Sequence, residues 1–432
     1  MKWIRVGICT LIVLAVLTFG GVEPWGQAIV EIGTAILLVF WGALVIRRGK
    51  LEVRWNWLYL PLLGLGLVAS LQLVFGLSVY PYLTKIELLK WASGGLLFVL
   101  TMESFESEEH IKQFIWFLLS LSFAVALFGI VQHFTSNGKL YWFVPLPPGA
   151  GPFGPFVDGD HFAGFVELTI PFGLALLLFR SWRHEQLTVL LLFTIVPIGA
   201  LTLTASRGGI ISLFFEIVLL VFLSRRQATR KRQLFAAAAI LLIAGSFIAW
   251  LGANRAIERF QQLAGGGISQ ELRFSIYRDT WRIILDHPWI GTGLGTLATV
   301  YPHYASFYNG LTVDHAHNDF LEVLADTGIV GGVCGLSFFL LLFWLGFSNL
   351  QSQCTPLARA AVAGALTSCI GLLLHGLVDF NLHIPANGLI FLLASCIATL
   401  GHRKVSRYRH VALAAESSQS DLPFSASVTH NI

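Results

Sequence analysis

The chain has 432 residues, of which 55% are hydrophobic and 12% are charged. A composition this apolar excludes an ordinary soluble enzyme and indicates a polytopic membrane protein. The formal net charge of +4 is carried by loops that face anionic lipid in the orientation derived below, so it gives no case for a nucleic-acid-binding protein.

Twelve apolar stretches have the length, or nearly the length, of about 17 to 25 residues that a helix needs to cross a bilayer. They fall at about 6–20, 27–46, 57–76, 86–102, 112–134, 161–179, 187–203, 208–223, 234–251, 328–347, 359–379 and 385–401. No small-residue cleavage site follows the first stretch, so we expect a retained helix. The sequence therefore predicts an all-α integral membrane protein with about twelve transmembrane helices.

The basic residues predict the orientation of these helices. When the twelve spans alternate from a cytoplasmic start, most of the 28 basic residues fall on the cytoplasmic side. Both termini are then cytoplasmic, and the long polar segment 252–319, between spans nine and ten, is periplasmic. We expect a membrane domain at 1–403 and a disordered cytoplasmic tail at 404–432, because that tail is polar and Ser-rich.

Two short polar segments lie at the outer ends of predicted spans. The Gly/Pro-rich segment 151–164 carries Asp158 and Asp160, and it is either a turn in which Asp160 caps a helix or a loop that lines a substrate site. The second segment contains Ser206, Arg207 and two glycines. Arg207 can bind lipid headgroups, or an anionic ligand such as a phosphate, which the glycines allow to approach the backbone.

The segment 270–282 has helical periodicity and three arginines. Arg278 and Arg282 share one helical face, whereas Arg273 lies about 140° from Arg278. The three guanidinium groups therefore cannot all bind one group. We expect Arg273 to face inward with Tyr277 and Trp281, and we expect Arg278 and Arg282 to flank Asp279 or to meet headgroups.

The segment 314–322 carries two histidines in a polar setting. Asp314 or Asn318 is expected to cap a short helix at 319–326, and His317 then lies at the N-terminus of that helix. The helix dipole disfavours an imidazolium there, which favours a neutral ring that can accept a proton. His315 and His317 are two residues apart and share no helical face, so a zinc pair is not predicted.

Taken in order, these segments resemble the bacterial O-antigen ligase and polymerase family. The resemblance covers roughly residues 20–400 and rests on the runs GPFVDGDHFAG at 154–164, SRGG at 206–209, LRFSIYRDTW at 272–281, HPWIGTGLG at 287–295, HAHNDFLE at 315–322 and HGLVDFNLHIPAN at 375–387. It implies a membrane glycosyltransferase of the helical GT-C type in the bacterial inner membrane. Such an enzyme moves a glycan from an undecaprenyl diphosphate carrier to an acceptor hydroxyl on the periplasmic face.

The resemblance also assigns roles to residues. Arg207 and Arg273 match diphosphate ligands, and His317 matches the general base or the group that orients the acceptor. Asp158 and Asp160 stand where many relatives carry asparagines, which leaves the identity of the acceptor open. The candidate catalytic residues are His317 and His315, and the candidate substrate-binding residues are Arg207, Arg273, Arg278, Asp158, Asp160 and Asn318. Because fixed arginines can stabilise the leaving diphosphate, we expect a reaction without a metal or another cofactor. Attack by the deprotonated acceptor on the opposite face of the anomeric carbon predicts inversion.

Alternatives remain both for the acceptor and for the class of function. The acceptor can be a glycolipid, as in a ligase of lipopolysaccharide biosynthesis, or another lipid-linked glycan, as in an O-antigen or exopolysaccharide polymerase; a protein hydroxyl is a third option. An anion transporter, for inorganic carbon, is the alternative of another class. It predicts inverted repeats and polar residues at mid-membrane depth, whereas we expect the ionisable groups to gather at the outer surface.

Overall fold

The computed structural model describes residues 1–49, 51, 53–146, 151–180, 182–225, 270–308 and 312–400. Within these residues the secondary structure is helical, and no strand is formed. The elements are α1 (Lys2–Leu17), η1 (Phe19–Gly21), α2 (Pro24–Arg48), α3 (Tyr59–Val74), α4 (Pro81–Ser104), α5 (Glu108–Thr135), α6 (Gly159–Glu167), α7 (Ile170–Phe179), α8 (His184–Leu203), α9 (Arg207–Ser224), α11 (Gln270–Asp286), α12 (Leu297–Val300), η2 (Tyr301–His303), α13 (Asp319–Ser352), α14 (Pro356–His375), η3 (Asn381–His383) and α15 (Pro385–Thr399).

The helices confirm the all-α membrane fold. Eleven of the twelve predicted spans coincide with helices of the described part, whereas the span at 234–251 and the tail at 404–432 lie outside it. Seven helical stretches in the described residues are long and apolar enough to cross a bilayer, and α3 and α15 are shorter apolar helices. The total of twelve spans stays a prediction.

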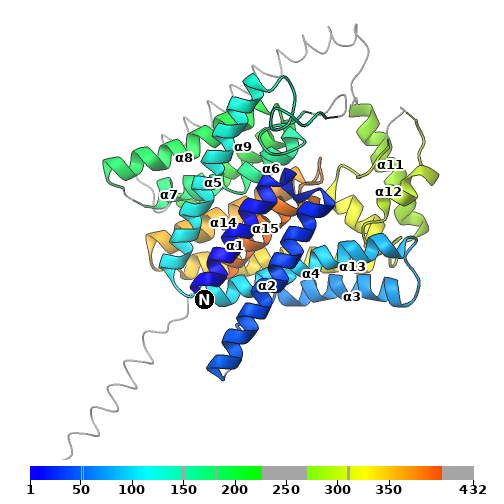
Figure 1. Ribbon diagram of the computed structural model, residues 1–432, viewed down its shortest axis with the longest axis horizontal. Coiled ribbons are helices and arrows are strands. Elements are labelled where there is room, and N and C mark those ends of the chain that lie inside the picture. Colours follow the sequence, from blue (N-terminus) through cyan, green and yellow to red (C-terminus); the bar gives the residue numbers. More distant parts are fainter. Residues whose placement is uncertain are drawn as a thin grey trace, which may run out of the picture. The chain divides into compact units, whose positions relative to one another are not determined.

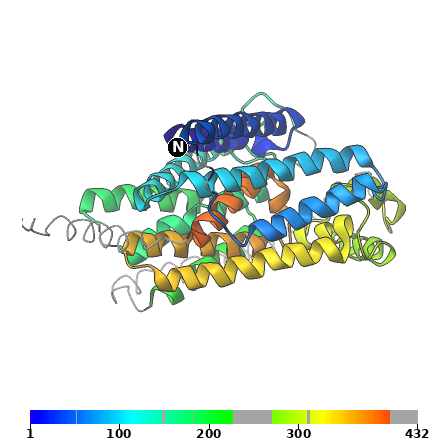
Figure 2. The same cartoon turned by 90° about the horizontal axis from the view of Figure 1, so that it is seen from below.

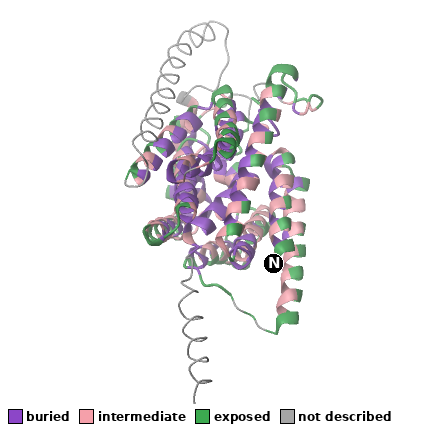
Figure 3. Ribbon diagram, turned by 90° about the vertical axis from the view of Figure 1, so that its left-hand side faces the viewer, coloured by how far each residue is buried: buried purple, intermediate pink, exposed green. Residues whose placement is uncertain are grey.

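Helix α14 forms the centre of the helical packing. It lies against α7, α9 and α15, and small side chains such as Ala361, Ala363 and Ala365 allow the neighbouring backbones to come close. Figure 3 shows the contrast with α2, which is exposed along its length and buries only Gly26 and Thr34. Helices α3, α4 and α13 run side by side (Figure 2).

Two of the predicted apolar helices are interrupted in the structure. The predicted span at 161–179 is divided into α6 and α7, because Pro171 at the start of α7 cannot donate a backbone hydrogen bond to the preceding turn. Helix α13 is kinked at Gly328, whose φ of 64° is favourable only for glycine. The kink divides α13 into a short first segment, residues 319–327, and a longer membrane-spanning part. This division agrees with the predicted helix at 319–326 and the predicted span from 328.

The described part of the predicted periplasmic segment is helical. Helix α11 packs on α13, and with α12 it lies at one end of the helices (Figure 1). Buried Asp279 of α11 accepts hydrogen bonds from the Tyr301 hydroxyl and the Ser306 backbone N–H. A small apolar cluster that includes Ile283 and Val300 completes this unit. Residues 252–269 of the segment lie outside the described part.

Candidate functional site

Five segments that are far apart in the sequence meet where α6 and α9 begin and α14 ends. They are the start of α6, the start of α9, one face of α11, the loop before α13, and the loop 376–380 after α14. The contacts that join them involve Asp160, Arg273, His317, His375 and Asp379. The sequence predicted three of these residues as site residues, and the fold adds His375 and Asp379.

Asp379 lies at the centre of these contacts and is 2% exposed. Its Oδ1 atom is 3.4 Å from His317 Nδ1, and its Oδ2 atom is 4.0 Å from His375 Nε2. Burial by itself would raise the pKa of Asp379, but the contact with His317 and the charges of His161 and His375 lower it below its ordinary value. Asp379 is therefore an anion at neutral pH, and it is oriented toward His317.

Arg273 connects α11 with two other segments. One terminal nitrogen donates to the Val378 carbonyl at 3.0 Å, and the other lies 3.7 Å from Asp160 Oδ2. Tyr277, one turn later, donates its hydroxyl to the His317 carbonyl at 2.8 Å. These contacts confirm the inward face that the sequence predicted for Arg273 and Tyr277. The same prediction is wrong for Trp281, which is 49% exposed.

His317 has an uncommon backbone conformation. Its φ of 50° lies in the left-handed region, as does the φ of 59° at Ala205, two residues before Arg207. Such conformations in residues other than glycine are held by the surrounding structure and concentrate at functional sites. Here the Tyr277 hydroxyl bond to the His317 carbonyl and the Asn318 cap of α13 hold the backbone that follows the His317 ring.

Asn318 has a structural role, and its role as a substrate-binding residue stays a prediction. Its side-chain oxygen accepts from the backbone N–H groups of Phe320 and Leu321, and its side-chain amide donates to the Leu377 carbonyl at 2.8 Å. Asn318 therefore caps α13 and holds the loop after α14 against it. Of the two caps that the sequence allowed, Asn318 is the one observed.

His315 belongs to a second network beside the first. Its Nδ1 atom is 2.7 Å from Glu322 Oε1, and its ring stacks on Phe380 with centroids 4.0 Å apart. His383 contacts Asp319 at 2.7 Å and Glu322 at 3.5 Å. Burial would lower the pKa of His383, but the charge of Glu322 and the hydrogen bond with Asp319 raise it to about 9.

Phe380 separates the two networks. Its ring contacts His161, His315 and His317 at centroid distances of 4.8, 4.0 and 5.1 Å. The apolar ring thus packs against three imidazoles and leaves their nitrogen atoms available for hydrogen bonds. Sequence reasoning assigned Phe380 no role, because an aromatic residue in an apolar stretch has no distinguishing pattern.

Glu167 and His375 form a buried pair next to Asp379. His375 Nδ1 lies 3.0 Å from Glu167 Oε1, and both side chains are at most 1% exposed. On α9, both carboxylate oxygens of Glu216 are buried and have no hydrogen-bond partner in the described part of the chain. Glu167 and Glu216 thus lie within predicted spans, in addition to the ionisable groups that we expect at the outer surface. The signal was available, because an acidic residue inside a predicted span is costly and marks function by default.

Arg207 begins α9 next to this pair. Ser206 caps the helix by accepting from the Gly209 N–H at 3.1 Å. A Cβ atom on Gly208 would lie 2.5 Å from the His375 ring, so only glycine allows α9 to approach so closely. The backbone next to Arg207 therefore lies beside His375. The start of α6 lies near the start of α9, because a Cβ atom on Gly159 would be 3.2 Å from Thr204.

The other predicted residues divide into two groups. Asp158, and not Asp160, caps α6, because its Oδ1 accepts from the Asp160 N–H at 2.9 Å. Asp160 is instead the partner of Arg273. Arg278 lies away from this arrangement: it donates to Ser306 at 2.9 Å and lies 3.9 Å from Asp279. It therefore flanks Asp279, as the sequence allowed, and does not join Arg273.

One group in the described residues has the geometry to hold a metal ion. Asp160, His375 and Asp379 bring ligand atoms within 4.8 Å of one another. The bond from His375 to Glu167 is of the kind that orients metal-bound histidines. The Arg273 guanidinium, 3.7 Å from Asp160, places a fixed cation beside the same carboxylates.

Comparison with known proteins relates part of the chain to a described family. The family model described as O-antigen ligase matches residues 189–336, which include Arg207, Arg273, His315 and His317. The chain is 20% identical to the teichuronic acid biosynthesis protein TuaE of Bacillus subtilis, over 61% of this chain and 55% of that protein. It is 24% identical to an O-antigen ligase of Pseudomonas aeruginosa, over 54% of this chain and 50% of that protein.

The chain spans about half the length of the curated relatives it matches. The family match covers Arg207, Arg273 and His317, and the fold joins Arg273 to Asp160 and His317 to Asp379. Residues 189–336 thus match the O-antigen ligase family, and the described helices are those of a membrane protein.

Proposed function

We propose that this protein is an O-antigen ligase-like glycosyltransferase of cell-surface polysaccharide biosynthesis. It moves a glycan from undecaprenyl diphosphate to the hydroxyl of an acceptor glycolipid at the periplasmic face of the bacterial inner membrane. The observation that carries this proposal is the contact of His317 with buried Asp379, close to the arginine that bridges Asp160 and Val378. These residues combine a proton acceptor with a fixed cation in one place.

The donor diphosphate binds Arg207 and Arg273 in this proposal. Guanidinium groups present parallel donors that match phosphate oxygens, and they keep their charge at any physiological pH. Arg273 already contacts Asp160. The diphosphate therefore competes with that carboxylate for the guanidinium, and Asp160 becomes free to contact the sugar or the acceptor.

His317 acts as the general base. Its Nδ1 atom faces Asp379, which leaves Nε2 for the acceptor. The carboxylate selects the tautomer with the proton on Nδ1 and stabilises the imidazolium that forms. The acceptor oxygen loses its proton to Nε2 and attacks the anomeric carbon, and the glycosidic bond breaks with its electron pair on the diphosphate. Attack from the opposite face inverts the anomeric configuration.

His315 and Arg278 have supporting roles in this mechanism. His315 is held by Glu322 and Phe380 and shapes the loop that carries His317. Arg278 fixes α11 to the segment that follows it through Ser306. Neither residue needs to contact the donor.

Polymer extension is the second candidate function. The similarity to a teichuronic acid biosynthesis protein favours it, because that relative is not an O-antigen ligase by name. The two functions share the donor and the chemistry and differ in the acceptor. Inorganic-carbon transport has less support, since it gives no reason for the contact between His317 and Asp379.

Reconstitution tests the proposal directly. Purified protein in liposomes receives a radiolabelled undecaprenyl-diphosphate-linked glycan together with either a lipid A core acceptor or a second lipid-linked glycan. We expect label to move to one acceptor with the wild-type protein and not with His317→Ala. Transfer to the second lipid-linked glycan alone would assign a polymerase. Binding of donor without transfer to either acceptor would contradict both functions.

A further inference from the structure

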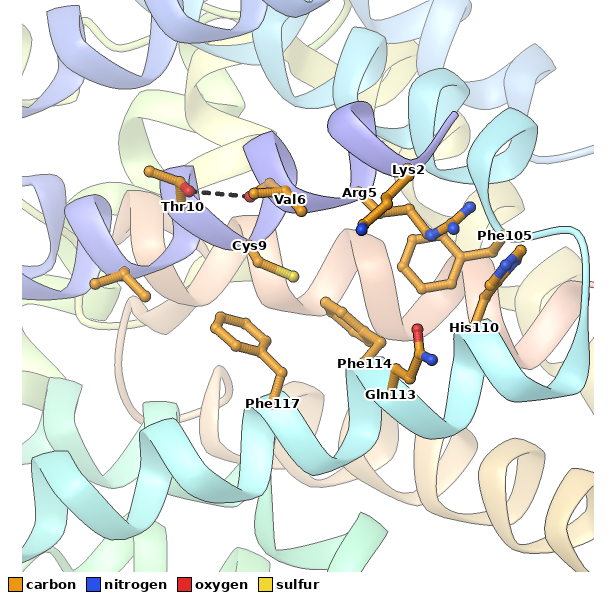
Figure 4. Close-up of a pocket in the computed structure, with 11 residues that line it drawn as sticks. Lys2, Arg5, Val6, Cys9, Thr10, Phe105, His110, Gln113, Phe114 and Phe117 are labelled. Carbon is orange, nitrogen blue, oxygen red and sulfur yellow. Dashed lines mark hydrogen bonds between the residues drawn. The ribbon is translucent and has the colours of Figure 1, made fainter.

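A groove lies between α1 and α5 (Figure 4). None of its lining residues belongs to the candidate functional site. Its volume of about 380 Å³ falls within the range of about 300–1,000 Å³ that small-molecule sites occupy. The lining comes from one face of each helix and from the end of α4: Lys2, Arg5, Val6, Cys9, Thr10, Val13, Phe105, His110, Gln113, Phe114 and Phe117.

The groove has a polar end and an apolar end. Lys2 and Arg5 belong to the first turns of α1, and His110 and Gln113 belong to the first turns of α5. Figure 4 shows these four side chains gathered at one end, whereas Cys9 and Phe117 lie toward the other. The groove therefore changes from cationic to apolar along its length, as a single lipid molecule changes from headgroup to acyl chain.

The cationic end has unused donors. In the described residues no carboxylate forms an ion pair with Lys2 or Arg5. One Arg5 nitrogen donates to the Ser104 carbonyl at 2.8 Å, which orients the guanidinium and leaves its other N–H groups available. A guanidinium held in this way matches a phosphate group.

The acidic residues near this end do not reverse its charge. Glu106 and Glu109 flank His110 at the start of α5 and are exposed. Glu109 pairs with Lys112, with 3.1 Å between nitrogen and oxygen. The groove lining itself contains basic and neutral side chains and no carboxylate.

One side of the groove is open to the outer surface of the protein. The groove is also distant from the candidate site. Val6 is 46% exposed on its rim. The opposite end of α1 leads to Gly20, which lies against Phe156 and Ile384 on the side of the candidate site. The 16 residues of α1 span about 24 Å, close to the thickness of a bilayer core.

We propose that this groove binds one anionic glycerophospholipid. The headgroup phosphate contacts Lys2 and Arg5, and one acyl chain lies along Cys9, Val13 and Phe117. Charge complementarity selects the anionic lipid over a zwitterionic one, because each basic residue near a membrane surface contributes about 1 kcal/mol of attraction to anionic lipid. The proposal does not depend on the glycosyltransferase function.

Photo-cross-linking in nanodiscs tests this proposal. The full chain is placed in phosphatidylcholine discs that contain a phosphatidylglycerol probe with a photoreactive group on its acyl chain. We expect cross-links to peptides of α1 and α5. The double substitution Lys2→Gln and Arg5→Gln should lower them about thirtyfold, the effect of two basic residues at about 1 kcal/mol each. A phosphatidylcholine probe should cross-link weakly, and excess inorganic phosphate should not displace the lipid.

Two further variants control the result. Arg47→Gln with Arg48→Gln removes two exposed charges at the end of α2, away from the groove, and should change the cross-links less than twofold. Val13→Trp keeps the charges and fills the apolar end, and it should also lower the cross-links. Equal labelling by both probes, an equal loss in the α2 control, or displacement by inorganic phosphate would overturn the proposal. If the Lys2 and Arg5 variant does not fold, unchanged labelling of Val13→Trp overturns it as well.

Discussion

His317 Nδ1 and Asp379 Oδ1 lie 3.4 Å apart although 62 positions separate these residues in the sequence. The contact joins the loop before α13 to the loop after α14. It gives His317 the carboxylate partner that a general base in a transfer reaction needs, and it supports the following predictions.

His317→Ala should lower single-turnover transfer about 100- to 10,000-fold, the usual effect of removing a general base. Donor binding should remain, because the arginines hold the diphosphate. Asp379→Asn should lower transfer in the same way, since the amide no longer selects the reactive tautomer. His315→Ala is the comparison and should be milder. If His315→Ala loses transfer while His317→Ala keeps it, the two roles are reversed.

Arg207→Lys and Arg273→Lys should each lower turnover by more than tenfold although the charge is retained. Lysine loses the parallel donors that match a diphosphate, whereas an exposed ion pair alone contributes at most about 1 kcal/mol. Arg282→Lys on the same helix is the matched control, since Arg282 lies 3.6 Å from Asp279 and not at Asp160. Steady-state transfer and donor affinity are measured for all three. Normal transfer by Arg207→Lys and Arg273→Lys would remove them from the donor site.

The predicted orientation can be checked at Tyr308, which is 89% exposed. In a background without the five native cysteines, Tyr308→Cys should react with an impermeant maleimide in intact spheroplasts. Arg48→Cys should react only after lysis, because the end of α2 is expected on the cytoplasmic side. The reverse pattern of labelling would place residues 270–308 inside the cell.

The His383 network should make stability depend on pH. The pKa of His383 is raised from 6.5 to about 9, so the protonated ring stabilises the fold fully below about pH 6.5. That contribution, on the order of 3 kcal/mol, is lost as the pH rises through about 9. Thermal unfolding between pH 6.5 and 10 should show a decline in wild type that His383→Gln reduces. His303→Gln, an exposed histidine, should keep the wild-type decline.

Removal of divalent ions should leave transfer unchanged, because the arginines supply the positive charge at the leaving group. The measurement compares transfer in liposomes before and after treatment with a chelator, with magnesium, manganese and zinc added back separately. If chelation stops transfer and one ion restores it, Asp160, His375 and Asp379 are a metal centre. Asp160→Asn should then weaken binding of that ion.

The sequence by itself determined the class of the protein and much of its outline. Long apolar stretches predicted eleven of the observed helical segments, because crossing lipid requires length and hydrophobicity that are visible locally. Helical periodicity also predicted the inward face of Arg273 and the separation of Arg278. Cap residues predicted the short helix before Gly328.

Only the tertiary structure decided which polar residues act together. His375 and Glu167 are 208 positions apart, and nothing in the local pattern of either segment predicts their contact. The side chain of Asn318 both caps α13 and links it to the Leu377 carbonyl, and this link is visible only in the fold. Hydrophobicity sets where helices run, whereas the packing of α14 against α6, α9 and α13 sets which side chains meet at their ends. That packing depends on side-chain shape along whole helices, which no short segment of the sequence contains.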